Sequence, residues 1–246
     1  MTGELTAAAV QGELSKVADA GDAVHLRRFF KTGPGEYGAG DVFIGVRVPK
    51  TRAVVKPFAG MPLSEIDLLL DSAVHEHRLA GLIILNGEMA RATRTRSADV
   101  AAQQRITDLY LAAVRRGRVN NWDLVDASAE FVLGPWLLAR PRDVLFELAA
   151  ADSLWEWRVA LLTTFAFIKA GDTGTTLELC ERFLEDKRDL IQKAVGWMLR
   201  EIGKRVDRAI LTGFLDAHAP AMGRTALSYA TEHLTSEQRA HYRSLR

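Results

Sequence analysis

The sequence has few of the residues on which several classes of small protein depend. It contains one cysteine in 246 residues, Cys180, which lies in an apolar helical stretch, residues 177–184. A single thiol can form neither a disulfide framework nor a cysteine-based zinc site. This scarcity favours a reducing compartment, and we expect the protein in the cytoplasm.

Long apolar runs are also missing. The longest one falls far short of the ~18–20 residues that a transmembrane helix needs, and residues 1–16 have no apolar run behind a basic start. We therefore expect neither a signal peptide nor a membrane partner. The formal net charge is only +1, so a polyanion has to be bound by local clusters of Lys and Arg rather than by the field of the whole molecule.

Strand patterns are missing too, and apolar residues recur at the helical period. Helices are expected within residues 3–32, 49–59 and 75–92, and Ser64 with Asp67 three residues later indicates a capping start. Helix breakers then recur along the rest of the chain, which predicts one short helix after another. These breakers are Gly117, Asn120-Asn121, Gly134-Pro135, Arg140-Pro141-Arg142, Asp152-Ser153, residues 171–174 and Ala219-Pro220.

Residues 33–49 are the one segment that cannot form a regular helix throughout. They contain five glycines and two prolines. Their spacing fits neither the phosphate-binding P-loop pattern nor a dinucleotide fingerprint. The composition favours a structured turn that fixes the next helix over a phosphate cradle.

Three later segments begin in a similar way. Each has a polar residue and a base followed by small and aliphatic residues, and the bases are Arg78, Arg158 and Lys193. Their spacing fits a helical-hairpin repeat of roughly 35–40 residues with one intervening unit near Trp122. Stacked hairpins would form a curved solenoid whose inner surface is lined by the second helix of each repeat.

A tryptophan and a carboxylate align in residues 119–126 (VNNWDLVD). An asparagine suits the helix N-cap, and the four-residue spacing places Trp122 and Asp126 on one face. The plain alternative is a core tryptophan beside a solvated or capping aspartate. Two later motifs, residues 155–158 (WEWR) and 192–197 (QKAVGW), favour a functional pair.

Four separated motifs agree with one known family in order and approximate spacing. They are GPGEYG…GDVFIGVRVP (33–49), NWDLVD (121–126), WEWR (155–158) and QKAVGWMLRE (192–201). On these motifs the chain resembles the AlkD family of DNA alkylation repair glycosylases over about residues 26–205. The resemblance implies an all-α fold, a right-handed superhelical solenoid of HEAT-like antiparallel helix pairs with a concave DNA-binding face. It implies a single domain, 1–246, with helices in 1–32, the Gly/Pro-rich loop in 33–49 and stacked hairpins in 50–246.

The resemblance also implies a reaction. Such enzymes remove positively charged N3- and N7-alkylated purines from duplex DNA by hydrolysing the N-glycosidic bond, without drawing the base into a deep pocket, so bulky adducts are expected to be accepted. Asp126 matches the catalytic carboxylate, and Arg158 matches the base that contacts the DNA backbone near the lesion. Trp122 and Trp197 match the aromatic walls that contact the deoxyribose.

Further contacts to DNA are expected at Phe29, Arg47, Trp155, Lys193 and Arg200. Phe29 stands where relatives carry a tyrosine, with Phe30 as the other alignment, and Arg47 stands where relatives can carry a glutamine. Binding of the DNA backbone also requires exposed bases. The candidates are Arg94, Arg96, Arg115, Arg116, Arg118, Lys187, Arg188, Lys193, Arg200, Lys204, Arg205 and Arg208. We expect about half of them to pair with acids instead, such as Asp186, Asp189 and Glu201.

The residue inventory agrees with this chemistry. A purine alkylated at N3 or N7 is already cationic and leaves without protonation, so one carboxylate can oppose the charge of an oxocarbenium-like sugar and activate water. No metal or other cofactor is required. His75 and His77, the close-set histidines, lie two apart on a helix and point away from each other. We expect a monomer that acts on alkylated double-stranded DNA without an obligatory protein partner.

Three other functions stay open on sequence alone. Stacked helical hairpins commonly serve as protein-binding scaffolds without catalysis. A non-catalytic DNA binder would share the basic residues but would have no need of Asp126 and Arg158. An enzyme that protects a producer from its own DNA-alkylating antibiotic is the third, and the Ala-, Arg- and Val-rich composition is compatible with the GC-rich genome of such a producer.

Overall fold

The computed structural model describes residues 4–94, 96 and 98–245. Residues 1–3, where the predicted N-terminal helices were expected to begin, lie outside this described part. The described chain is helical, which confirms the all-α class, and its one β-type pairing is an isolated bridge between Val42 and Val74. The chain divides into two compact units, Met1–Val132 and Leu133–Arg246.

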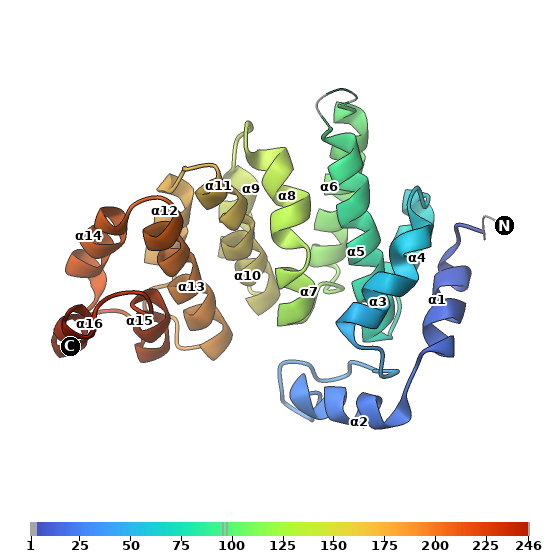
Figure 1. The fold of residues 1–246 in the computed structure, drawn as a ribbon, viewed down its shortest axis with the longest axis horizontal. Coiled ribbons are helices and arrows are strands. Elements are labelled where there is room, and N and C mark those ends of the chain that lie inside the picture. The colour runs from blue at the N-terminus through green and yellow to red at the C-terminus, as the bar shows by residue number, and fades with distance from the viewer. Residues whose placement is uncertain (1–3, 95, 97, 246) are drawn as a thin grey trace. The chain divides into compact units, whose positions relative to one another are not determined.

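Unit 1 is built around the long helix α5, which packs against α1, α3, α4 and α6. Figure 1 shows these helices in blue to green. Leu79, Leu82, Leu85 and Met89 of α5 are almost fully buried and form the centre of this core. The elements of unit 1 are α1 (Ala7–Lys16), α2 (Ala20–Phe29), α3 (Val48–Val55), the 3₁₀ turn η1 (Lys56–Phe58), α4 (Leu63–Leu70), α5 (His75–Ala92), α6 (Val100–Arg115) and α7 (Trp122–Asp126).

Unit 2 is built around α13, which packs against α10, α11, α12, α14 and α15. Helix α8 (Ala129–Leu137) spans the boundary between the units. The elements that follow are α9 (Asp143–Ala150), α10 (Leu154–Thr163), α11 (Phe165–Lys169), α12 (Gly174–Arg182), α13 (Asp189–Arg205), α14 (Arg208–His218), α15 (Arg224–Ala230) and α16 (Ser236–Ser244).

The QKAVGW motif joins α13 to α15. Gly196 lets the two helices approach closely, because a Cβ at this position would lie 2.4 Å from the carbonyl oxygen of Ala226. The side-chain oxygen of Gln192 accepts the N–H of Thr225 at 3.2 Å and so satisfies a donor in the first turn of α15. Two residues of the motif are therefore explained by packing within unit 2.

We predict that Gly196→Ala destabilises the protein by about 1–3 kcal/mol, because the added methyl group meets backbone that cannot move aside. Gly213→Ala in α14 is the matched control, since nothing lies within 4 Å of a Cβ there. At that exposed helical position alanine should stabilise by about 0.5–1 kcal/mol. Urea unfolding of both variants measures the two effects, and equal midpoints would contradict the packing role of Gly196.

One predicted helix has the bounds that the sequence indicated, and two others are divided. Helix α5 covers residues 75–92 as expected. The predicted N-terminal segment contains two helices, α1 and α2, since the side chain of Asp19 accepts the N–H of Asp22 at 2.8 Å and starts α2. The predicted helix 49–59 is α3 followed by η1, because Pro57 has no amide hydrogen to continue the α-helical pattern.

Two local predictions were wrong. Ser64 does not cap a helix, because α4 begins at Leu63 after the extended Pro62 and has no side-chain cap. Gly134-Pro135 does not end a helix either, because both residues lie inside α8. A Cβ at Gly134 would lie 2.4 Å from Cβ of Ala166, so this glycine serves close packing rather than a turn.

Two findings concern the apolar character of the helices and the single cysteine. Among the described residues, no helix is long and apolar enough to cross a membrane. Cys180 is fully buried in α12, and this burial raises the pKa of its thiol.

Candidate functional site

Helix α7 carries the aligned tryptophan and carboxylate at its two ends. Asn121 is fully buried and forms the predicted N-cap, since its side-chain oxygen accepts the N–H of Trp122 at 2.8 Å. Asp123 accepts the N–H of Leu124 with Oδ1, also at 2.8 Å. Trp122 and Asp126 are both half-buried. These hydrogen bonds set the direction in which the five-residue helix leaves the preceding loop.

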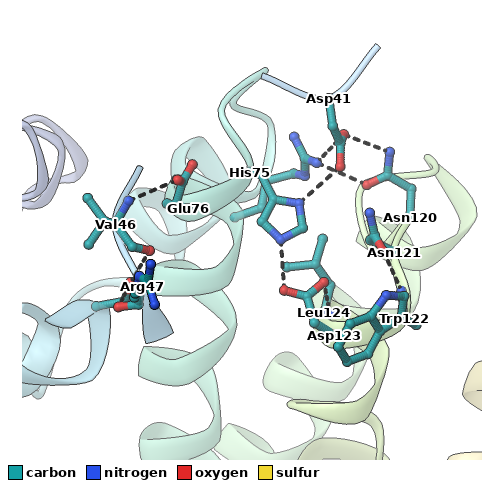
Figure 2. A network of polar contacts seen from close by, with 12 residues as sticks. Asp41, Val46, Arg47, His75, Glu76, Asn120, Asn121, Trp122, Asp123 and Leu124 are labelled. Carbon is teal, nitrogen blue, oxygen red and sulfur yellow. Dashed lines mark hydrogen bonds and ion pairs between the residues drawn. The ribbon is translucent and has the colours of Figure 1, made fainter. Parts of the chain in front are cut away.

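A buried ionic network ties this helix start to α5 and to the Gly/Pro-rich loop (Figure 2). His75, the first residue of α5, places Nδ1 2.9 Å from Asp41 and Nε2 2.8 Å from Asp123. Arg78 donates to the second oxygen of Asp41 at 2.6 Å and to the side-chain oxygen of Asn120 at 3.1 Å. The side chains of His75, Asp41 and Arg78 are all less than 5% exposed.

The network favours the charged forms of His75 and Asp41. Burial lowers the pKa of His75, but the two neighbouring carboxylates, Asp123 foremost, outweigh it and raise this pKa to about 9. Burial raises the pKa of Asp41, and here the hydrogen bond from His75 and the charge of Arg78 bring it below its usual range. At neutral pH His75 is therefore a cation and Asp41 a carboxylate.

Glu76 fixes the Gly/Pro-rich loop from the other side of α5. Its carboxylate is buried and accepts the backbone N–H groups of Ile44, Gly45 and Val46 at 2.8–3.2 Å. Gly45 has φ +85°, and a Cβ there would lie 1.9 Å from the carbonyl oxygen of Asp19. Because a protein carboxylate already occupies these amides, the segment is a structured turn, as the composition favoured, and not a phosphate cradle at this point.

Aromatic rings surround a pocket of about 340 Å³ in unit 1. Phe30 stacks between Phe43 and Trp122, with ring centroids 5.2 and 5.3 Å away. Phe29 meets Trp122 edge-on at 6.0 Å and is 54% exposed. Of the two residues considered for the tyrosine position of the first repeat, Phe29 is thus the one that presents its ring to solvent.

Three of the predicted site residues, Phe29, Arg47 and Trp122, line this one pocket. Arg47 is the N-cap residue of α3, and its guanidinium binds Asp22 with contacts of 2.6 and 3.0 Å. Its side chain remains 59% exposed. The structure therefore brings together the first-repeat residues that the resemblance selected, although Arg47 already has a carboxylate partner.

Asp126, at the end of α7, lies in unit 1 but does not line this pocket. The other predicted residues lie in unit 2. Arg158 is only 4% exposed and donates to the carbonyl oxygen of Leu190 at 2.6 Å, which links α10 to α13. Trp197 is half-buried and packs against Phe165 with centroids 5.9 Å apart, and Trp155 is half-buried at the start of α10. The roles of these three residues on DNA stay predictions, and the burial of Arg158 shows that it also contributes to packing.

The two remaining cations already bind carboxylates. Lys193 binds Asp189 at 2.7 Å. Arg200 binds Glu201 at 3.1 Å and also contacts Glu232. Burial lowers the pKa of Arg200, but these two carboxylates raise it above its ordinary value. A contact from either side chain to DNA would compete with an existing ion pair.

The expected pairing of about half of the basic candidates is confirmed. Asp186, Asp189 and Glu201 are all partners, as predicted. Within the described part of the chain, at least six of the twelve bases bind an acid, namely Arg116, Arg118, Arg188, Lys193, Arg200 and Arg205.

Sequence reasoning missed the Asp41, His75 and Asp123 network. The signal that could have revealed it was His75, a polar residue at the start of an otherwise apolar helix. The sequence argument considered His75 only together with His77. The two histidines have different partners, since His77 forms a hydrogen bond with Ser72 at 2.9 Å. Within the described residues, no three His, Cys, Asp or Glu side chains are grouped to hold a metal ion.

The fold is similar to that of a solved structure described as a predicted DNA alkylation repair enzyme from Enterococcus faecalis. The two chains share 17% identity with a TM-score of 0.68, over 89% of this chain and 97% of the other. At this identity the likeness concerns the fold alone.

The sequence itself defines the family. The family model for DNA alkylation repair enzymes matches residues 10–234, which is most of the chain. The protein therefore belongs to the DNA alkylation repair enzyme family, as the four motifs predicted, and its role is in DNA repair. No curated protein matches it in sequence.

Proposed function

We propose that the protein is a monofunctional DNA glycosylase that hydrolyses the N-glycosidic bond of cationic N3- and N7-alkylated purines in duplex DNA. The observation that carries the proposal is the family match together with the construction of α7. Trp122 and Asp126 stand on a short helix whose start is fixed by a buried ionic network. Such preorganisation is what electrostatic stabilisation of a transition state requires.

The proposed chemistry uses one carboxylate. Asp126 opposes the positive charge that develops on the sugar as the bond to the cationic purine breaks, and it accepts a proton from the attacking water. The indole of Trp122 attracts the cationic sugar and base by cation–π contacts of about 0.5–2 kcal/mol. By resemblance, Trp197 supplies a second aromatic contact and Arg158 contacts a phosphate.

We assign DNA binding to basic side chains that are exposed to solvent rather than buried in a core. Arg94, Arg96, Lys187, Lys204 and Arg208 are exposed. Contacts of such side chains with phosphates release counterions, so the affinity for DNA should fall steeply as salt rises.

The test is release of free 7-methylguanine and 3-methyladenine from methylated duplex DNA by the wild-type protein, with unmethylated DNA as control. We expect both bases in the supernatant, and a bulky N7 adduct to be released as well. DNA binding without release of any base would favour a non-catalytic binder. Release of one particular adduct alone would favour an enzyme specialised for that adduct. Absence of both binding and release would favour a protein scaffold and overturn the proposal.

A further inference from the structure

His75 connects three segments that are distant in the sequence. It begins α5, its Nδ1 faces Asp41 of the loop, and its Nε2 faces Asp123 of α7. Its ring also stacks on Phe43 with centroids 4.4 Å apart. The side chain is 2% exposed, so the protein rather than water has to satisfy both ring nitrogens.

The two contacts together require the protonated ring. A neutral imidazole has one N–H and one bare nitrogen, and the bare nitrogen would face a carboxylate oxygen. An imidazolium donates to both Asp41 and Asp123. Arg78 also binds Asp41, whereas among the described ion pairs His75 is the cation that binds Asp123. Loss of the proton therefore affects Asp123 most.

Among the described ion pairs no second cation binds Asp123, and the charged groups next to His75 have other partners. Glu76, next to it on α5, is bound to the loop amides. Arg47, at the start of α3, binds Asp22. Phe30, which follows α2, and Asn120, which precedes α7, also belong to these surroundings, and neither is charged.

Helix α7 depends on such tertiary contacts. It has five residues, far fewer than the roughly 12–15 that an isolated helix needs to be marginally stable in water. Asp123 binds Leu124 with one oxygen and His75 with the other, so it joins the first turn of α7 to α5. The directions of Trp122 and Asp126 follow from this turn.

We propose that His75 is a positioning residue for base excision, and that its imidazolium, by binding Asp123, orients α7 and the two functional side chains on it. The inference rests on the proposed glycosylase function, because it concerns the geometry in which Asp126 acts. It adds to that function a pH limit set by a group that does not touch the substrate.

The direction of the pH effect follows from the shift of this histidine. Its pKa rises from 6.5 to about 9 because of the two carboxylates, despite the opposing effect of burial. Its stabilising contribution is complete below pH 6.5 and is lost as the pH rises through about 9. We expect the single-turnover excision rate to fall about threefold from pH 7.5 to 9.5, since about a quarter of the rings stay protonated at the upper pH and the neutral form is expected to be about tenfold slower.

The first arm of the test compares wild type, His75→Gln and the surface control His241→Gln. Excision of 3-methyladenine is measured from pH 7.5 to 9.5, with the enzyme-free rate subtracted and DNA affinity measured in parallel. His75→Gln should be about tenfold slower at pH 7.5, as expected for a modest misplacement of a reacting group, with unchanged affinity and no fall toward pH 9.5. Excision by His75→Gln at the wild-type rate, or with the wild-type pH profile, would overturn the inference.

The second arm needs neither activity nor a variant of the network. Wild type labelled with ¹⁵N-histidine and 5-fluorotryptophan is titrated by NMR from pH 6 to 10, with the Trp122 signal assigned from Trp122→Phe. The Trp122 fluorine signal should move with the same midpoint as the His75 nitrogens. If wild type releases no alkylpurine, the proposed function fails, and this arm still tests the orientation of α7. A Trp122 fluorine signal that does not change at the midpoint of the His75 titration would overturn the positioning role.

Discussion

Replacing Asp126 with asparagine is expected to slow the release of 7-methylguanine by about 10²–10⁴-fold, while DNA affinity stays within about threefold of wild type. Asparagine is nearly isosteric, so the N-cap and the packing of α7 are retained. It has no negative charge to oppose the developing oxocarbenium ion and cannot accept a proton from water. The measurement is single-turnover release with protein in excess over a duplex that contains one lesion.

Asp108→Asn is the matched control for this variant. Asp108 is an exposed carboxylate on α6, where it accepts a hydrogen bond from Gln104 at 2.7 Å. Its replacement removes the same charge at a place with no proposed role, so the excision rate should stay within about twofold of wild type, as usual for surface substitutions. Equal rates for wild type and Asp126→Asn would remove Asp126 from the mechanism.

Removal of the Arg78 guanidinium is expected to cost about 3–5 kcal/mol of folding stability. Arg78→Met preserves most of the side-chain volume but leaves the buried carboxylate of Asp41 without its closest cation, which now contacts it at 2.6 Å. The substitution also removes the hydrogen bonds from Arg78 to the carbonyl oxygens of Ser72 and Ala73, which precede α5. Urea unfolding monitored by circular dichroism measures the loss as a lower midpoint.

Two further variants separate charge from packing at this site. Arg52→Met, on an exposed position of α3, should change the stability by less than about 0.5 kcal/mol. The double variant Asp41→Leu, Arg78→Met should be more stable than Arg78→Met alone, because it removes the unpaired buried charge. A double variant that is less stable than the single one would show that the ion pair is not the cause.

Helical periodicity was sufficient to predict the fold class and the bounds of α5. It failed where one residue had two possible roles. Gly134-Pro135 has the composition of a turn, yet Gly134 lies inside α8 because its missing side chain makes room for Ala166. Such a packing requirement depends on a neighbour that periodicity does not identify.

The candidate site likewise has a part that the sequence predicted and a part that it did not. The resemblance to the family was sufficient to select Phe29, Arg47 and Trp122, which line one pocket. The network behind them was not predictable, because His75 bonds partners 34 and 48 residues away. Contacts of this range follow from the tertiary fold rather than from any local pattern.

Burial was the other property that sequence could not supply. Arg158 was selected as a base for DNA, and the structure places it 4% exposed with a bond to Leu190. Arg78 at the start of α5 is likewise buried and binds backbone oxygens. Arg78 near the start of α5 and Arg158 near the start of α10 thus both contribute to packing, whatever further role Arg158 has on DNA.

The most direct test of the account is the balance of products from a duplex with a single 7-methylguanine. Wild type in excess should release intact 7-methylguanine and create one abasic site for each base released, with the strand uncut and oxygen from ¹⁸O-labelled water at C1′. Loss of the methyl group with the guanine left in the strand, or no change in the DNA at all, would contradict hydrolysis of the N-glycosidic bond as the reaction of this protein.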